Sequence, residues 1–310
     1  MTYLIGIDGG GTRTTLALAD GAGREIVRRV GPPGLVDPRC PGDTAEMLAE
    51  LAAETLAEAG VKPPVAALCA GLAGVGSAAE REIVRSSLAA SGVAEQVVVR
   101  TDGETALEGA LGGGAGLLLV AGTGSVAYGR SEDGRVDRCG GWGLVVGDEG
   151  SGYAIGRAGL QAVVRAVDGR GPSTGLLPRL LEEMGIPAPE GIPPWAGRAE
   201  KSEIAALAVP VLELAASGDA VAECIVAEEA QGLAEHAAAL MRRLGPWGAP
   251  TRVVLHGGMT QDETYVRHLE RALAEMELPV EIREPARDAV AGAVQFARAA
   301  AESRTEAECA

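Results

Sequence analysis

The sequence is poor in aromatic residues and in positive charge. Only eight of its 310 residues are aromatic although 47% are apolar, so the core must be built from Val, Leu, Ile and Ala, which suits buried strands interleaved with helices. Its 43 acidic residues outnumber its 27 lysines and arginines, which gives a net charge of −16. Nucleic acids and anionic membranes bind basic surfaces, so this charge argues against both as partners.

Paired cysteines and long apolar runs are also missing. The five cysteines are scattered and include no Cys-x-x-Cys pair: Cys40, Cys69, Cys139, Cys224 and Cys309. Their number and spacing argue against a disulfide framework or a zinc site and favour a reducing compartment. No apolar run approaches the ~20 residues of a membrane span. The N-terminus has no basic region and reaches Asp8 after a short apolar stretch, unlike a signal peptide. We therefore expect a soluble, cytoplasmic protein.

Apolar runs and turn signals divide the first hundred residues into strands and helices. Strands are expected at 3–7, 14–19 and 25–30, with a hairpin turn at 20–23. Asp43 followed by Glu46 predicts the start of a helix that stops at Gly60, and Ser77 with Glu80 predicts the start of a second helix. Further strands at 65–69 and 97–99 complete a mixed α/β sheet.

The pattern restarts after the glycines at 112–114. A strand at 116–120, a glycine-rich polar loop, a strand at 126–128, a turn and another strand repeat the order of the first half. Helices are then expected at 152–167, 174–184, 203–217 (interrupted by Pro210) and 219–244, followed by strands at 252–256 and 280–284, with a helix between them and another after Asp288. This pattern predicts two domains, 1–114 and 115–310; the second carries a helical insertion, and its last helix could pack back on the first domain.

The first glycine-rich segment follows the first strand. Gly9, Gly10, Gly11 and Thr12 allow backbone N–H groups to point at an anion, as in phosphate-binding nests. Asp8 at the strand tip is placed to hold Mg²⁺, and Arg13 adds a local positive charge. The alternative is a simple hairpin turn with a surface Asp.

Two later segments have similar chemistry. Gly122, Thr123, Gly124 and Ser125 form a second loop between two strands, at the place equivalent to the first. Gly257 and Gly258 follow another strand, where they would let adenine or ribose lie against the backbone, or would simply form a turn into a helix. Two equivalent loops in two halves are expected to hold the phosphates of one nucleotide.

Together these segments resemble the two phosphate motifs and the adenosine motif of the actin, Hsp70 and sugar-kinase superfamily. The stretches Gly140–Gly143 and Gly147–Gly152 are similar to those of the N-acetylglucosamine kinase group of the BadF/BadG/BcrA/BcrD ATPase family. The resemblance covers nearly the whole chain. It implies a two-domain, actin-like ATPase (ribonuclease H-like) α/β fold with a nucleotide cleft between the domains, and ATP with Mg²⁺ as cofactors.

The resemblance also implies roles for individual residues. Asp102 would be the catalytic base that takes the proton from the sugar hydroxyl, with the N-cap of the following helix as its alternative role. The sugar pocket would be formed by Gly141, Trp142, Asp148, Glu149 and Ser151. The alternatives are core packing for Trp142 and loop structure for Glu149 and Ser151.

The implied activity is ATP-dependent phosphorylation of an amino-sugar, with N-acetylglucosamine to its 6-phosphate as the first choice. Val126, Gly34 and Arg13 depart from the group's pattern, which leaves the sugar open among glucosamine, N-acetylmuramate and other hexoses. An iron–sulfur ATPase activator, with Cys139 near its cleft, and a non-enzymatic ATP-binding scaffold remain as other classes. A homodimer is compatible with the resemblance.

Overall fold

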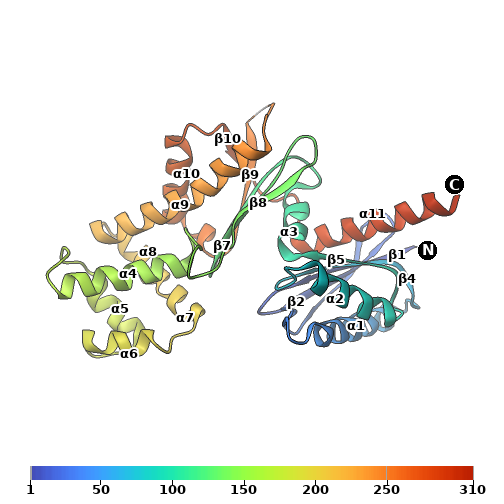
Figure 1. Ribbon diagram of the computed structural model, residues 1–310, viewed down its shortest axis with the longest axis horizontal. Coiled ribbons are helices and arrows are strands. Elements are labelled where there is room, and N and C mark those ends of the chain that lie inside the picture. Colours follow the sequence, from blue (N-terminus) through green and yellow to red (C-terminus); the bar gives the residue numbers. More distant parts are fainter. Residues whose placement is uncertain (1, 249, 310) are drawn as a thin grey trace. The chain divides into compact units, whose positions relative to one another are not determined.

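The structure is a computed structural model that describes residues 2–248 and 250–309, with side chains as far as Arg304. The chain forms two compact units (Figure 1). The first unit comprises the residues up to Gly114 together with those from Pro285 onward, and the second comprises Ala115–Glu284.

The first unit is built on a five-stranded mixed sheet with the strand order β3-β2-β1-β4-β5. Antiparallel pairing joins β1 to β2 and β2 to β3, while β4 is parallel to both β1 and β5. The strands are β1 (Tyr3–Gly9), β2 (Thr14–Asp20), β3 (Glu25–Gly31), β4 (Val65–Leu72) and β5 (Ala94–Thr101).

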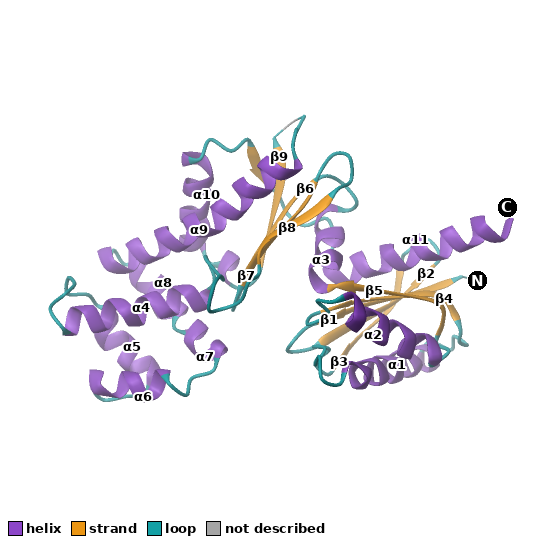
Figure 2. Ribbon diagram, in the orientation of Figure 1, coloured by secondary structure: helices purple, strands orange, loops and turns teal. Residues whose placement is uncertain are grey.

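Helices cover both faces of this sheet (Figure 2). On one face, α1 (Pro41–Glu58) and α2 (Ala78–Ala90) pack against the larger apolar cluster; α3 (Asp102–Leu111) follows β5. On the other face lies α11 (Ala289–Cys309), which approaches β1 so closely that a Cβ at Gly6 would lie 2.6 Å from Val294. The last helix therefore belongs to the core of the first unit.

The second unit repeats the first in strand order and direction. Its sheet runs β10-β9-β6-β7-β8, with β6 antiparallel to β7 and parallel to β9. The strands are β6 (Gly116–Ala121), β7 (Ser125–Arg130), β8 (Val136–Gly140), β9 (Thr251–His256) and β10 (Val280–Ile282). The repeat expected from the sequence is confirmed, and it places the two glycine-rich loops at equivalent hairpins, between β1 and β2 and between β6 and β7.

Most helices of the second unit lie between β8 and β9 in the sequence. They are α4 (Gly152–Val167), α5 (Leu176–Met184), α6 (Ile192–Ala196), α7 (Lys201–Ala206), α8 (Ala208–Ala216) and α9 (Ala220–Leu244), with α10 (Glu263–Glu275) after β9 and 3₁₀ turns at Pro189–Gly191 and Met259–Gln261. All of these α-helices except α7 contribute side chains to one apolar core that they share with the sheet.

Two helix boundaries differ from expectation. The first helix begins at Pro41, and its N-cap residue, Cys40, makes no side-chain cap, so the capping role expected of Asp43 is wrong. Proline is favoured at this first position because its fixed φ suits the helix and its missing N–H would have no partner there. The interruption expected from Pro210 is found three residues earlier, at Leu207, which separates α7 from α8. Pro210 itself lies in the first turn of α8, since proline has no N–H to donate to the carbonyl four residues before it.

Candidate functional site

The first glycine-rich loop has a fixed base and an exposed tip. Gly10 N–H donates to the carbonyl oxygen of Arg13 at 3.0 Å, and the carbonyl of Gly10 accepts from Gly34 N–H at 2.9 Å. Gly11 and Thr12 are exposed, and a Cβ at Gly11 would meet nothing within 4 Å. Within residues 2–248 and 250–309, no backbone carbonyl accepts from the N–H of Gly11 or Thr12. These two donors can therefore bind an anion from solution.

Asp8, next to this loop, is an unusual carboxylate. It occupies the second-to-last position of β1, and burial raises its pKa to about 6. The negative charges of Asp102 and Asp288 act in the same direction, and the positive charge of Arg13 acts against them. A cation beside Asp8 would compensate this charge, so the residues present fit a Mg²⁺ ion whose other ligands are phosphate oxygens and water.

Asp102 is not the cap of α3. The N-cap is Thr101, whose hydroxyl accepts from Glu104 N–H at 3.2 Å while Thr101 N–H donates to the Glu104 carboxylate at 2.8 Å. Asp102 follows as the first helical residue, and its carboxylate accepts from the adjacent Gly103 N–H. Burial raises the pKa of Asp102. The N-cap alternative is therefore wrong: Thr101 is the N-cap, and Asp102 accepts from the N–H of Gly103 in the first turn.

The second glycine-rich loop is fastened to the segment that precedes α4. The carbonyl of Gly122 accepts from Gly152 N–H at 2.8 Å, and the hydroxyl of Ser125 donates to the Glu149 carbonyl at 2.6 Å. Ser151 is fully buried, and its hydroxyl caps α4 by accepting from Ala154 N–H at 3.1 Å. Of the two roles considered for Ser151, sugar binding and loop structure, the structure therefore supports the structural one.

Asp148 lies beneath the same loop. Its residue is only 3% exposed, and its carboxylate accepts from Ser125 N–H at 3.2 Å and contacts Lys201 Nζ at 2.7 Å. Its backbone has a φ of 65°, a left-handed conformation that is uncommon outside glycine. The carboxylate expected to face sugar hydroxyls is thus engaged by the loop and by a lysine.

Trp142 and Glu149 flank the glycine-rich turn after β8. Trp142 is 69% exposed, so its core-packing alternative is wrong, and the Arg138 guanidinium lies 5.6 Å from its ring centroid. Glu149 is half exposed, and its carboxylate lies 3.5 Å from Nε2 of His236. Gly141, with a φ of 71°, donates its N–H to the Ser125 carbonyl at 3.1 Å and so ties this turn to the second loop.

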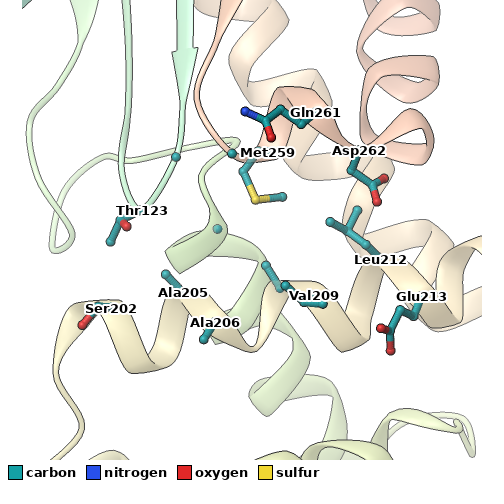
Figure 3. A pocket seen from close by; sticks show the side chains of 14 residues that line it. Thr123, Ser202, Ala205, Ala206, Val209, Leu212, Glu213, Met259, Gln261 and Asp262 are labelled. Atoms are coloured by element: carbon teal, nitrogen blue, oxygen red, sulfur yellow. The ribbon is translucent and has the colours of Figure 1, made fainter. Parts of the chain in front are cut away.

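A cavity of about 700 Å³ opens beside the second loop (Figure 3). Its polar side is formed by Gly122, Thr123 and Gly152, and its apolar side by Ala205, Ala206, Val209, Leu212 and Met259. Gly258 lines it too and has open space where a Cβ would be. At Gly257, φ is 106° and a Cβ would lie 2.3 Å from the Ala121 carbonyl, so only glycine fits. The volume and mixed lining suit a nucleoside.

The sequence did not reveal the residues of α7 and α8 in this cavity. Val209 is 57% exposed although it is apolar, and Ala205 and Ala206 are ordinary helix residues. The feature that identifies these residues is an apolar side of a helix that packs against no core residue. It becomes visible only when the structure places this helix beside the second loop. Lys201 and the contact between Glu149 and His236 were also missed, because both contacts join segments that are distant in the sequence.

The cysteines lie in different segments of the chain. Cys69 is buried in β4, Cys139 is partly buried in β8, and Cys40 and Cys224 are exposed, all as free thiols; the side chain of Cys309 is outside the described residues. Within the described part of the chain, no group of three or more His, Cys, Asp or Glu side chains is arranged to hold a metal ion. A metal at Asp8 would thus depend on ligands from the substrate and water.

No single helix among the described residues is long and apolar enough to cross a membrane. Lys201–Ala216 and Ala220–Leu244 reach the necessary length and apolar composition only together, and a bend of 119° separates them.

Two sheets of the same order, each with a glycine-rich loop at its first hairpin, define an actin-like ATPase fold of two domains. In the second of them a nucleoside-sized cavity lies beside that loop. The chain belongs to the BadF/BadG/BcrA/BcrD ATPase family, whose model matches residues 5–297.

Three similar proteins agree with this assignment. The N-acetylmuramic acid/N-acetylglucosamine kinase of Clostridium acetobutylicum is 30% identical over 96% of this chain and 99% of its own length. The N-acetyl-D-glucosamine kinase of Dictyostelium discoideum is 30% identical over 78% of this chain and 80% of its own length. A crystal structure of a candidate N-acetylglucosamine kinase from Chromobacterium violaceum superposes with a TM-score of 0.75 at 27% identity, covering 96% of this chain and 99% of that one.

Proposed function

We propose that this protein transfers the γ-phosphoryl group of ATP to the 6-hydroxyl of N-acetylglucosamine. The observation that carries the transferase chemistry is the carboxylate of Asp102, which stands at the carboxyl end of β5 and is not used as a helix cap. The choice of an amino-sugar is supported by two relatives that are named as kinases of N-acetylglucosamine, one of them also of N-acetylmuramic acid.

The nucleotide is assigned to the glycine-rich segments. In this proposal the adenosine occupies the cavity lined by Gly258, Met259 and the α7–α8 side chains, with Gly257 allowing the backbone to turn there. Each glycine-rich loop is proposed to bind phosphate through the donors it does not use internally: Thr123 and Gly124 in the second loop, and Gly11, Thr12 and the Arg13 side chain in the first. The N–H groups of Gly10, Gly122 and Ser125 already donate within the protein. Backbone donors suit a chain with a net charge of −16, because they attract phosphate without needing a basic surface.

Asp8 would hold Mg²⁺. When bound, the ion neutralises the charge that builds up on the phosphate oxygens during transfer. The raised pKa of Asp8, caused by burial and by neighbouring carboxylates, supports a cation at this position.

Asp102 acts as the base in this proposal. Its ionised carboxylate accepts the proton of the sugar 6-hydroxyl as the oxygen attacks phosphorus, which makes the oxygen a better nucleophile. The upward shift of its pKa, due to burial, makes it a stronger base than an exposed carboxylate. Trp142, Gly141 and Glu149 are assigned to sugar binding, and Ser151 supports them by holding the start of α4. Asp148 is left out of the sugar site, because its buried carboxylate is already engaged by Ser125 and Lys201.

A coupled assay of ADP release tests this function. With Mg²⁺ and ATP we expect N-acetylglucosamine to stimulate ADP release more than N-acetylmuramate, glucosamine or glucose, and phosphorus NMR to identify the 6-phosphate. N-Acetylmuramate is the second candidate, because one relative is named for both sugars. ATP hydrolysis that no sugar stimulates would contradict the proposal and favour an ATPase of another kind.

Blocking the cavity should prevent ATP binding. Ala206 is exposed and lines the cavity, so Ala206→Trp would place a large ring where the adenine is proposed to lie. We expect the Kd for ATP, measured by calorimetry, to rise at least about 10-fold, equivalent to about 1.4 kcal/mol, with little change in melting temperature. Ala216→Trp is the matched control, since Ala216 is exposed on α8 but does not line the cavity. Equal Kd values for the two variants would show that the nucleotide does not bind in this cavity.

A further inference from the structure

A buried carboxylate and a lysine meet under the second glycine-rich loop. Asp148 Oδ1 accepts from Ser125 N–H at 3.2 Å, and Asp148 Oδ2 lies 2.7 Å from Lys201 Nζ. The Asp148 side chain is 4% exposed, whereas the Lys201 side chain is 34% exposed. One partner is therefore fixed in the protein, and the other reaches the surface.

Lys201 is a rare residue in an unusual place. The chain has 27 basic residues, but only two are lysines, Lys62 and Lys201. Lys201 begins α7, and its ammonium would lie 2.9 Å from a Cβ at Gly124. The ammonium thus lies against the backbone of the second loop, where any side chain larger than glycine would displace it or Asp148.

This ammonium lies near the loop end of the cavity. Ser202, the next residue of α7, lines the cavity together with Gly122 and Thr123. In Figure 3, Thr123 and Ser202 lie at one end, whereas Asp262 and Glu213 lie at the other. A nucleoside in the apolar part would therefore extend its phosphates toward the end where Lys201 begins α7.

We infer that Lys201 binds the phosphate chain of the nucleoside triphosphate and that Asp148 is the positioning residue that holds its ammonium at the second loop. The inference rests on the proposed ATP site. A triphosphate carries several negative charges, and Asp148 carries one, so a partly exposed ammonium is attracted to an arriving triphosphate more strongly than to its carboxylate alone. In so acidic a chain, this cation adds a full positive charge to the partial charges of the backbone donors.

The rival explanation is that Lys201 only neutralises Asp148. A buried carboxylate left without its partner is destabilising, so an ion pair would be retained for that reason alone. The two explanations differ in which ligand responds to removal of the ammonium. A phosphate contact affects ATP and leaves adenosine unaffected, while loss of a purely structural pair disturbs the loop and either affects both ligands or neither.

The test compares ATP with adenosine by calorimetry on the full chain. We expect Lys201→Gln to weaken ATP binding about 10- to 100-fold, as for loss of a charged hydrogen bond, and to change the Kd for adenosine less than twofold. The dependence of ATP affinity on salt should also decrease. Lys62→Gln is the matched control, because Lys62 is the only other lysine and is exposed in the first unit; it should bind both ligands as the unmodified protein does.

A second variant covers the case in which Lys201→Gln unfolds. Combining it with Asp148→Asn removes the unpaired buried charge, so melting temperature should recover while ATP binding stays weak. Recovery of ATP affinity in the double variant, equal weakening of ATP and adenosine, or unchanged ATP binding in Lys201→Gln would each overturn the inference. If the unmodified protein binds ATP and phosphorylates a sugar in those cases, only the role of Lys201 fails; if it binds no ATP, the proposed function fails as well.

Discussion

Asp102→Asn should still bind ATP and N-acetylglucosamine but phosphorylate the sugar about 10²–10⁴ times more slowly, the usual contribution of a positioned base. The amide has the size of the carboxylate but cannot accept the proton of the hydroxyl. The fold should be unaffected, because Thr101 and Glu104 cap α3 without Asp102. Loss of a first-turn negative charge costs about 0.3–1 kcal/mol at most, and removal of its repulsion with Asp8 offsets part of that.

Turnover, sugar affinity and melting temperature should be measured on one preparation of this variant. Asp43→Asn is the matched control, since Asp43 is also a carboxylate in the first turn of a helix but is exposed on α1. We expect the control to lose a similar small amount of stability and no turnover. Near-normal turnover in Asp102→Asn would refute the proposed base, and loss of sugar binding would make Asp102 a binding residue instead.

Asp8→Asn should lower turnover by about 10²-fold or more, because a metal ion supplies several kcal/mol of charge stabilisation in the transition state. Titration of Mg²⁺ against initial rate should show that the remaining activity needs a higher Mg²⁺ concentration. A variant that keeps normal activity with unchanged Mg²⁺ dependence would show that the metal, if used, is held elsewhere.

The same variant should be more stable than the unmodified protein in EDTA at pH 8. Burial raises the pKa of Asp8 from 3.8 to about 6, so the folded state becomes less stable as pH rises through this interval. Replacing the carboxylate removes that cost, which is roughly 1–3 kcal/mol above pH 6, and the gain should shrink toward pH 4. Asp20→Asn is the contrasting control: hydrogen bonds from Arg24 lower the pKa of Asp20, so its replacement should not stabilise. Melting temperatures at pH 5 and pH 8 decide the matter.

The strands and the two hairpin loops could be predicted because their signals are local. An apolar run that ends in glycines identifies β1 or β6 without knowledge of its neighbours, and the repeated order then predicted the paired sheets. The cap of α3 could also have been found: Thr101 and Glu104 have the spacing of a capping box, which favours Thr101 over Asp102.

The remaining features depend on contacts between distant segments. Lys201 and Asp148 are 53 residues apart, and nothing in the sequence around either shows that they pair. Likewise, Val209 resembles a core residue by type, and only the packing of α8 reveals that it faces a cavity. The tertiary structure determines what such residues contact, and the local sequence pattern carries no information about those contacts.

The place of α11 in the first unit has a consequence for how the chain folds during synthesis. Val290, Ala293, Val294 and Ala297 cover Leu4, Ala17 and Cys69, so one face of the first sheet lacks its cover until α11 leaves the ribosome. The segment Ala115–Glu284 is contiguous and separates the two parts of that core. At ordinary rates of synthesis this delay lasts about 10–30 s. The second unit is therefore the first that can complete its core, although it is synthesised later. Until α11 has been synthesised, one apolar face of the N-terminal sheet stays exposed to chaperones.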